Sequence, residues 1–186
     1  MGDFLLVALV IWFAMELGLL VFKRAGRSAR KADCASLGMI WLLILLGNGT
    51  GVYLGSLRIG YVDLAPQFCY YAGTSLILLG VVLRLVAILQ LKQFFTVNVA
   101  LRADHRIISS GLYRVLRHPS YTGSLISFAG LGISFSNWLS VVVIFTPVCL
   151  AFLNRIRIEE AELEGHFGEE YREYQRRTRR LIPGVW

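Results

Sequence analysis

The sequence has few charged residues and few cysteines. Of its 186 residues, 17% are charged and 56% are hydrophobic, and the mean hydropathy is +0.60. In a typical water-soluble domain about a quarter of the residues are charged, so this composition excludes a single water-soluble domain. It also excludes a disordered or collagen-like chain. Cys34, Cys69 and Cys149 are far apart and form no C-x-x-C pair, which argues against a disulfide framework and a zinc site. We expect these cysteines to be packing residues.

Long stretches without charge predict membrane-spanning helices. The stretch 4–22 would span about 28 Å as a helix, close to the hydrocarbon thickness of a bilayer. It is longer than the apolar part of a signal peptide and follows no basic residue, so we expect a retained anchor. The expected spans are residues 4–22, 36–57, 68–91, 122–136 and 138–153, the last two joined at Asn137 as a tight helical hairpin. The sequence therefore predicts an all-α polytopic membrane protein with about five transmembrane helices.

The basic residues, which give a net charge of +7, cluster in alternate connections between these spans. Lys and Arg gather in residues 23–31, 92–117 and 172–180, whereas Arg58 is the only cation between the second and third spans. Cytoplasmic loops collect Lys and Arg, so we expect the N-terminus outside and the C-terminus and active site in the cytosol. Basic clusters separated by apolar runs also favour a membrane over nucleic acid as the partner.

Two ionisable residues, Glu16 and Arg84, lie within expected spans. A charge in hydrocarbon is costly, so each should face the bundle interior or a wet cavity. For Arg84 the alternative is snorkelling toward the cytosolic end of its helix. For Glu16 we favour a simple carboxylate at the interface. The sequence shows no convincing pair of charges near the middle of a span, so it does not favour a small transporter.

A dense polar motif, residues 109–123, comes directly before the fourth expected span. Pro119 biases His118 toward an extended conformation and holds its imidazole at the entrance of a helix. The start of a helix favours an anion, while Tyr113 and Tyr121 offer aromatic faces to a cation. Alone, each tyrosine could belong to an aromatic belt and the histidine could be a cap. Their combination indicates a binding site.

A second polar cluster follows the fifth expected span. Arg155, Glu159, Glu162 and His166 are spaced i, i+4, i+7 and i+11 and would share one face of a helix. An ordinary ion pair is the alternative, although arginine preceding glutamate is the weaker orientation for one. We expect a polar stripe at the membrane surface.

Both clusters belong to a longer series of matching positions. In order, these are Leu83-Arg84, Ala87, Phe94-Phe95-Thr96, Asp104-His105, Ser110-Gly111-Leu112-Tyr113, Arg117-His118-Pro119-Ser120-Tyr121-Thr122-Gly123, Arg155, Glu159-Glu160, Leu163 and Phe167-Gly168-Glu169-Glu170-Tyr171. The series resembles the isoprenylcysteine carboxyl methyltransferase family over roughly the C-terminal 100 residues. The pair formed by RHPSY and EE…FGEEY is far more selective than either half. The first two spans have no motif.

The resemblance implies an integral membrane enzyme that transfers a methyl group from S-adenosylmethionine to a lipophilic substrate entering from the bilayer. It implies a cytosolic cofactor pocket built from the loop before the fourth span and the C-terminal helix. It divides the chain into residues 1–67, which hold two transmembrane helices, and residues 68–186, the methyltransferase core with three. We expect no metal site and no nucleic-acid partner.

The resemblance also assigns residues to roles. The positions matching cofactor-binding residues are Asn98, His105, Arg106, Ile107, Ile108, Tyr113, His118, Pro119, Ser120, Tyr121 and Glu159. Arg155 matches the contact to the substrate carboxylate, and we expect Arg155 and Glu159 to be the catalytic residues.

Methyl transfer to a carboxylate needs orientation more than acid–base chemistry. A carboxylate is already ionised at neutral pH, and Arg155 could orient it through a two-pronged hydrogen bond. An amine acceptor must lose a proton, which Glu159, Glu160 or His118 would have to accept.

Three alternatives stay open on the sequence alone. One is a methyltransferase acting on a phospholipid amine or on another isoprenoid acid. Another is a non-catalytic membrane protein whose basic face binds anionic lipid, with each Lys or Arg near the surface contributing about 1 kcal/mol. The last is the small transporter, which the absence of a convincing charge pair disfavours.

Overall fold

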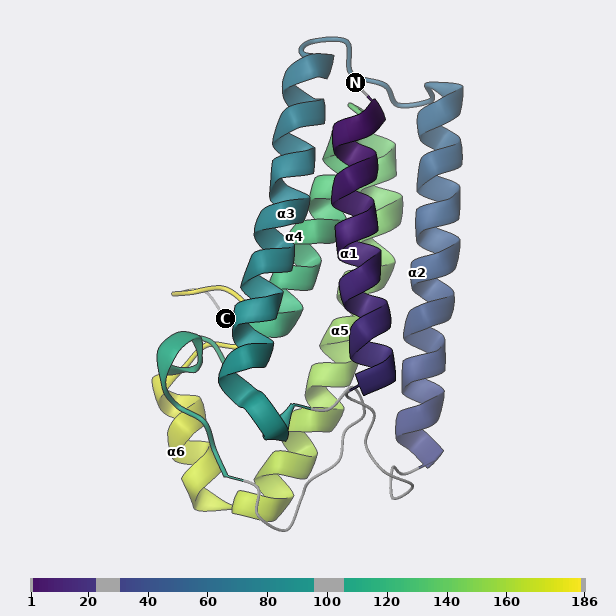
Figure 1. Cartoon of the computed structure of the whole chain (residues 1–186). Helices are drawn as coiled ribbons and strands as arrows, with labels where there is room; N and C mark the ends of the chain where they lie inside the picture. Colours follow the sequence, from purple (N-terminus) through teal and green to yellow (C-terminus); the bar gives the residue numbers. More distant parts are fainter. Residues whose placement is uncertain (1, 23–30, 96–105, 185–186) are drawn as a thin grey trace.

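Helices make up nearly all of the described chain. The computed structural model describes residues 2–22, 31–95 and 106–184, except for the side chains of 22, 31–37 and 93. The elements are α1 (Gly2–Phe22), α2 (Lys31–Leu57), α3 (Pro66–Leu91), η1 (Lys92–Phe94), η2 (Gly111–Arg114), α4 (Pro119–Ser134), α5 (Trp138–Phe167) and α6 (Glu169–Arg177). Within the described residues, β-structure is limited to two isolated bridges. The expected all-α class is confirmed (Figure 1).

Four described helices, α1, α2, α3 and α5, are long and apolar enough to cross a membrane. The fourth expected span forms α4, but its 16 residues extend only about 24 Å, less than the hydrocarbon core. The fifth does not end at residue 153 as expected, because α5 continues as one helix to Phe167. A membrane bundle is therefore present, while the expected number of five spans stays a prediction.

The expected hairpin at Asn137 is present between α4 and α5. The Asn137 side chain accepts a hydrogen bond from the Ser140 backbone N–H at 3.0 Å and thereby caps α5. Its Nδ2 donates to the Ile59 carbonyl at 2.8 Å. One side chain thus begins α5 and ties the hairpin to the segment after α2.

Small residues let α3 and α4 pack backbone against backbone. A Cβ on Gly123 would lie 2.6 Å from the Gly80 carbonyl oxygen, and one on Gly130 would lie 2.5 Å from the Gly73 carbonyl oxygen. Such close approach is how helices associate in a membrane, where burial of apolar side chains gives no net drive. This seam fixes the start of α4 against α3.

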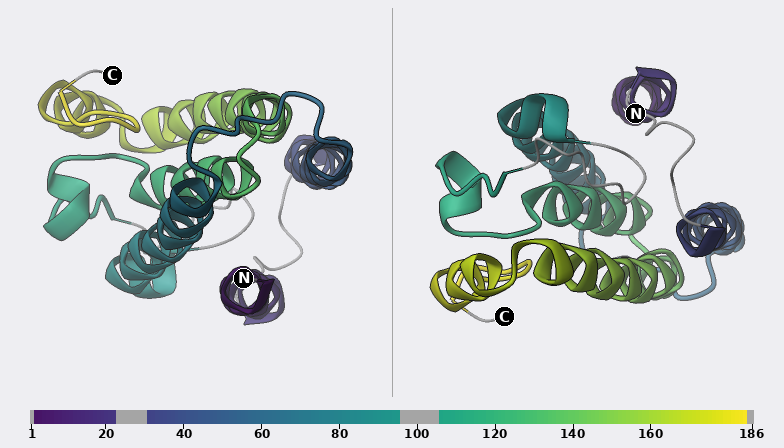
Figure 2. Two further views of the ribbon diagram at one scale, coloured as in Figure 1. Left: turned by 90° about the horizontal axis from the view of Figure 1, so that it is seen from above. Right: turned by 90° about the horizontal axis from the view of Figure 1, so that it is seen from below.

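The N-terminal helix α1 packs mainly against α3 (Figure 2). The Leu5 backbone N–H donates to the Tyr70 hydroxyl at 3.0 Å. Farther along α1, Trp12 contacts Phe128 of α4 edge to face, with ring centroids 4.7 Å apart. The second helix, α2, packs against α5.

The C-terminal segment folds back beside the loop that precedes α4 (Figure 1). Gly168 has φ +57, a conformation that side chains disfavour, and it turns the chain from α5 into α6. The backbone N–H of Arg117 donates to the Arg179 carbonyl at 2.7 Å, and that of His118 donates to the Arg180 carbonyl at 3.1 Å. Two segments distant in sequence are thus joined at the entrance of α4.

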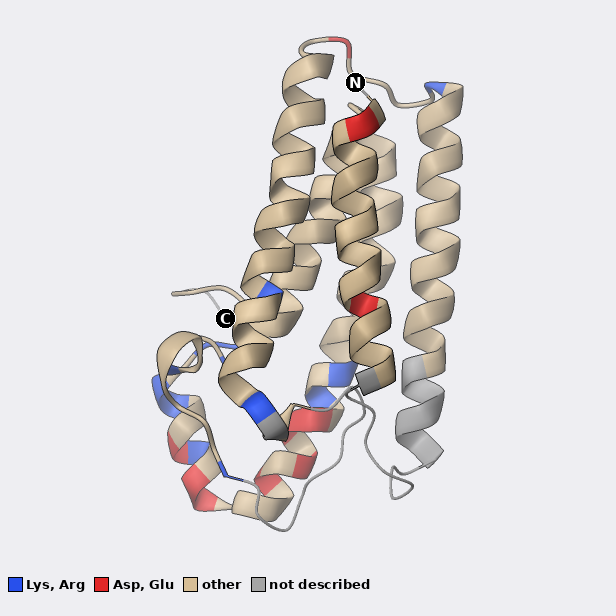
Figure 3. Ribbon diagram, viewed as in Figure 1, with Lys and Arg blue, Asp and Glu red and all other residues tan. Residues whose placement is uncertain are grey.

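Charged residues gather at the end of the bundle where α6 lies (Figure 3). This matches the charge pattern of the sequence, although which end faces the cytosol stays a prediction. Among the cysteines, Cys149 packs against the core and Cys69 is half-buried. The side chain of Cys34 lies outside the described residues.

Candidate active site

A cavity of about 500 Å³ lies between α1 and α2 on one side and α3, α4 and α5 on the other. This volume is in the range of small-molecule sites. Its wall toward α1 and α2 is mostly apolar and includes Leu9, Trp12, Leu20, Ile40, Ile44 and Val52. Its polar residues come mainly from the segment 106–118, from the start of α4 and from α5, with Arg84 from α3. The cavity therefore joins an apolar region inside the bundle to a polar region near α6.

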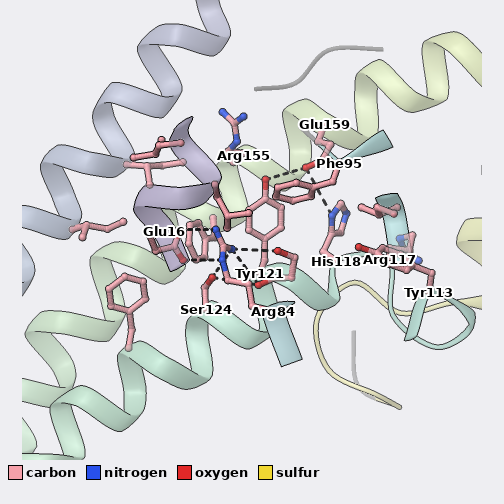
Figure 4. A pocket seen from close by; sticks show the side chains of 18 of the residues that line it. Glu16, Arg84, Phe95, Tyr113, Arg117, His118, Tyr121, Ser124, Arg155 and Glu159 are labelled. Carbon is pink, nitrogen blue, oxygen red and sulfur yellow. Dashed lines mark hydrogen bonds and ion pairs between the residues drawn. The ribbon is translucent and has the colours of Figure 1, made fainter. Parts of the chain in front are cut away.

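Tyr121 and Glu159 meet in the polar region (Figure 4). The Tyr121 hydroxyl donates to Glu159 Oε2 at 3.1 Å, and His118 Nδ1 lies 4.0 Å from the same oxygen. The Glu159 side chain is 32% exposed, so its carboxylate faces the cavity rather than the protein core. Phe152 packs against the Tyr121 ring, with ring centroids 5.0 Å apart.

Arg155 lies one helical turn before Glu159 on α5 and also lines the cavity. It is 3% exposed, and its guanidinium interacts with Tyr121. The cavity face of α5 continues with Leu163 and Phe167, whereas Glu162 and His166 do not line it. The expected four-residue polar stripe therefore contributes only its first two members to the site.

Glu160 has a different role from its neighbour Glu159. Its Oε1 accepts a hydrogen bond from Arg117 Nε at 2.8 Å and lies 3.2 Å from His118 Nε2. Its Oε2 accepts from Arg180 Nε at 2.8 Å. The Glu160 side chain is 5% exposed, so this carboxylate ties the loop before α4 to the C-terminal segment. It also holds the His118 imidazole between the two glutamates.

The remaining predicted cofactor residues differ in placement. Arg106, Ile107, Ile108, Tyr113 and Ser120 line the cavity. Pro119 does not line it but is fully buried in the first turn of α4. Asn98 and His105 lie outside the described residues. The structure thus brings most of these positions together around one space.

Buried and half-buried tyrosines line the cavity near α6. The Tyr113 hydroxyl donates to the Ala87 carbonyl at 3.3 Å, and the Tyr174 hydroxyl donates to the Tyr113 carbonyl at 2.8 Å. Burial, and next the negative charge of Glu159, raises the pKa of Tyr113 far above its usual value. Burial likewise raises the pKa of Tyr171. These side chains are neutral hydrogen-bonding and packing groups.

Glu16 and Arg84 are paired, which corrects the expectation for Glu16 and agrees with the expectation that Arg84 faces the bundle interior or a cavity. Arg84 Nη2 donates to Glu16 Oε2 at 2.9 Å, and both residues line the cavity. Glu16 is therefore not a simple interfacial carboxylate, and Arg84 does not snorkel to the helix end. The sequence does not reveal this pair, because its two residues are 68 positions apart. Both lie past the middle of their helices, α1 and α3.

The sequence predicted that the C-terminal helix helps to form the pocket, but it assigned no role to the tyrosines of α6 and did not place the residues of α1 and α2 at the cavity. Tyr174 and Tyr171 line it, and the three-residue spacing that places both on one side of a helix could have indicated this. Trp12 and Ile44 belong to spans without any motif, so only the packing of the bundle places them at the cavity.

The arginines of the C-terminal tail pair with nearby acidic residues. Arg172 Nε lies 2.7 Å from Glu164 Oε1, Arg176 Nη2 lies 3.2 Å from Glu169 Oε1, and Arg177 pairs with Glu173. These pairs partly neutralise the tail, which weakens the case for a surface that binds anionic lipid.

The site combines groups that favour opposite charges. The Glu159 carboxylate and the Tyr121 ring favour a cation, whereas the Arg155 guanidinium one turn away favours a carboxylate. The adjoining apolar wall suits a hydrocarbon chain. Fold and site together define an integral membrane protein with an internal ligand cavity.

The chain belongs to the isoprenylcysteine carboxyl methyltransferase family, whose model matches residues 73–165, half of the chain. The matched region includes most of α3, all of α4 and most of α5. It therefore holds the polar residues of the site from Arg84 to Glu159, but not the wall formed by α1 and α2.

Individual relatives agree with this assignment. The chain is 35% identical over 115 residues to protein-S-isoprenylcysteine O-methyltransferase B of Arabidopsis thaliana, covering 61% of this chain and 58% of that protein. It is 33% identical over 131 residues to the Saccharomyces cerevisiae protein-S-isoprenylcysteine O-methyltransferase, covering 69% and 55%. The chain thus spans little more than half the length of these curated relatives.

A solved structure supports the fold assignment. The structure of the eukaryotic intramembrane Ras methyltransferase ICMT matches with a TM-score of 0.67 at 28% identity. The match covers 76% of this chain and 52% of that one.

Proposed function

We propose that this chain transfers a methyl group from S-adenosylmethionine to the carboxylate of a membrane-embedded lipophilic acceptor of the isoprenylcysteine type. The observation behind the proposal is that Arg155 and Glu159 lie one helical turn apart in a cavity whose other wall is apolar. A cation and a carboxylate with a hydrocarbon tail can therefore be bound side by side. Family membership favours the same chemistry.

The residues present fit the cofactor. When bound, S-adenosylmethionine supplies a methyl group on a positively charged sulfur. Tyr121 and Tyr113 offer aromatic surfaces, and Glu159 offers a partly exposed carboxylate for a cationic or hydroxyl group. Arg106 to Ile108 line the same part of the cavity. His118 directly precedes the first turn of α4 and is held by Glu160.

Arg155 would orient the acceptor carboxylate through two parallel hydrogen bonds. Because a carboxylate is ionised at neutral pH, this reaction requires no general base. Glu160 is already bound by two arginines, so it would not accept the proton that an amine acceptor must lose. The acceptor's apolar tail would lie along α1 and α2, which form candidate membrane spans, so we infer that it enters from the bilayer.

The same proposal sets the orientation in the membrane. We infer that the end holding α6 faces the cytosol, with the N-terminus outside, because the basic residues of the sequence concentrate there. We further infer that residues 68–186 form the methyltransferase core and that residues 1–67 complete the wall for the acceptor.

Calorimetric titration with S-adenosylhomocysteine tests the cofactor part of the proposal. Purified protein in detergent should bind it saturably, and Glu159→Gln should weaken binding about tenfold, the loss of one charge-assisted hydrogen bond. Glu170→Gln, an exposed residue of α6 outside the cavity, is the matched control. Absence of binding by a folded wild-type protein would refute the proposal.

A further inference from the structure

Glu16 and Arg84 line the cavity, but the proposed reaction does not use them. Arg84 Nε lies 2.8 Å from Glu16 Oε1 in an ion-pair contact, and Nη2 donates to the other carboxylate oxygen at 2.9 Å. On its other side, Nη1 donates to Ser124 Oγ at 2.6 Å and to Ser120 Oγ at 3.2 Å. The guanidinium is therefore surrounded by protein oxygens, and Glu16 opposes its charge.

Four arginines line the cavity: Arg84, Arg106, Arg117 and Arg155. Arg117 is bound by Glu160 and Arg106 lies over the Phe94 ring, so the two arginines on the spanning helices α3 and α5 are Arg84 and Arg155. A guanidinium stays charged at any relevant pH and binds a carboxylate bidentately. In Figure 4, Arg155 points away from the Glu16–Arg84 pair, so a carboxylate bound at one arginine would be displaced from the other. Displacement of a reacting group by about 1 Å can cost about a hundredfold in rate.

We infer that Glu16 is a specificity-determining residue: by pairing with Arg84, it prevents this arginine from binding the acceptor carboxylate and directs the carboxylate to Arg155. The inference rests on the proposed function. Glu16 belongs to α1, which lies outside the matched region 73–165. The inference therefore assigns a function to a helix for which the family match gives none. The serines of α4 alone do not provide this masking, since hydroxyls leave the positive charge of Arg84 unopposed.

Removal of the Glu16 charge tests the inference. In Glu16→Gln, Arg84 becomes a second carboxylate site. We expect preference for N-acetyl-S-farnesylcysteine over its methyl ester, measured by calorimetry with S-adenosylhomocysteine present, to rise several-fold. We expect kcat for the free acid to fall about tenfold because part of the acceptor binds out of reach. Affinity for S-adenosylhomocysteine should not change.

A double variant separates masking from a merely structural role. Glu16→Gln combined with Arg84→Met removes the competing cation together with its mask, so kcat should return toward the wild-type value. It also avoids an unpaired buried charge, which protects folding. Thermal unfolding of each variant checks that it is folded, and Glu170→Gln is again the control.

The outcomes distinguish the inference from the proposed function. If wild-type protein binds the acid but Glu16→Gln shows the same preference and kcat, the inference alone is overturned. A double variant with kcat well below the wild-type value overturns it as well. If wild-type protein binds S-adenosylhomocysteine but not the acid, the carboxylate acceptor is wrong, and the inference falls with it.

Discussion

Glu160→Gln should release the C-terminal segment from the loop before α4. The carboxylate accepts hydrogen bonds from Arg117 and Arg180 and faces His118, and it is almost fully buried. Glutamine removes the negative charge and replaces one acceptor oxygen with a donor that opposes the arginines. Breaking a buried ion pair by removing one partner costs about 3–5 kcal/mol. At the lower limit, this shifts the equilibrium between docked and released tail about a hundredfold.

Hydrogen exchange measures this release directly. The backbone N–H groups of Arg117 and His118 donate to carbonyls of residues 179 and 180, so their exchange should accelerate about a hundredfold if opening is limited by this contact. Affinity for S-adenosylhomocysteine should fall too, because Tyr171 and Tyr174 line the cavity from the same segment. Glu164→Gln, which loses only the exposed contact to Arg172, should change neither measurement. Unchanged exchange in folded Glu160→Gln protein would refute the reasoning.

Three further predictions follow from the site and the helix seam. Arg155→Lys should lower kcat about a hundredfold because a lysine cannot form the two-pronged contact, while calorimetry shows unchanged cofactor affinity; unaltered turnover would remove Arg155 from the acceptor site. His118→Ala should weaken binding of S-adenosylhomocysteine about tenfold through loss of its contacts to both glutamates, and an identical dissociation constant would contradict this. Gly123→Ala should lower thermal stability by about 1–3 kcal/mol, because its methyl group would collide with the Gly80 carbonyl; Gly18→Ala, with open space around it, is the matched control.

Much of the site was predictable because its residues are close in sequence or lie at helical spacing. His118 and Tyr121 belong to one motif, and Arg155 and Glu159 are four residues apart, so a helix places them on the same side. Proline and helix geometry affect only neighbouring residues, so their effects can be predicted from one sequence. The sequence could not predict that Glu159 faces the cavity while Glu160 binds arginines. The two glutamates are adjacent, and their roles differ only because different residues from other segments contact them.

Composition and charge pattern by themselves determined that this protein is helical and embedded in a membrane, because long apolar runs have few other stable states in a bilayer. The motifs determined the family and most candidate site residues. Only the tertiary structure decided that Glu16 and Arg84 pair and that α1 and α2 line one side of the cavity. It also decided that residues 179 and 180 of the C-terminal segment hydrogen-bond to the loop before α4. These contacts join residues tens of positions apart, and their energies depend on distances that no local pattern specifies.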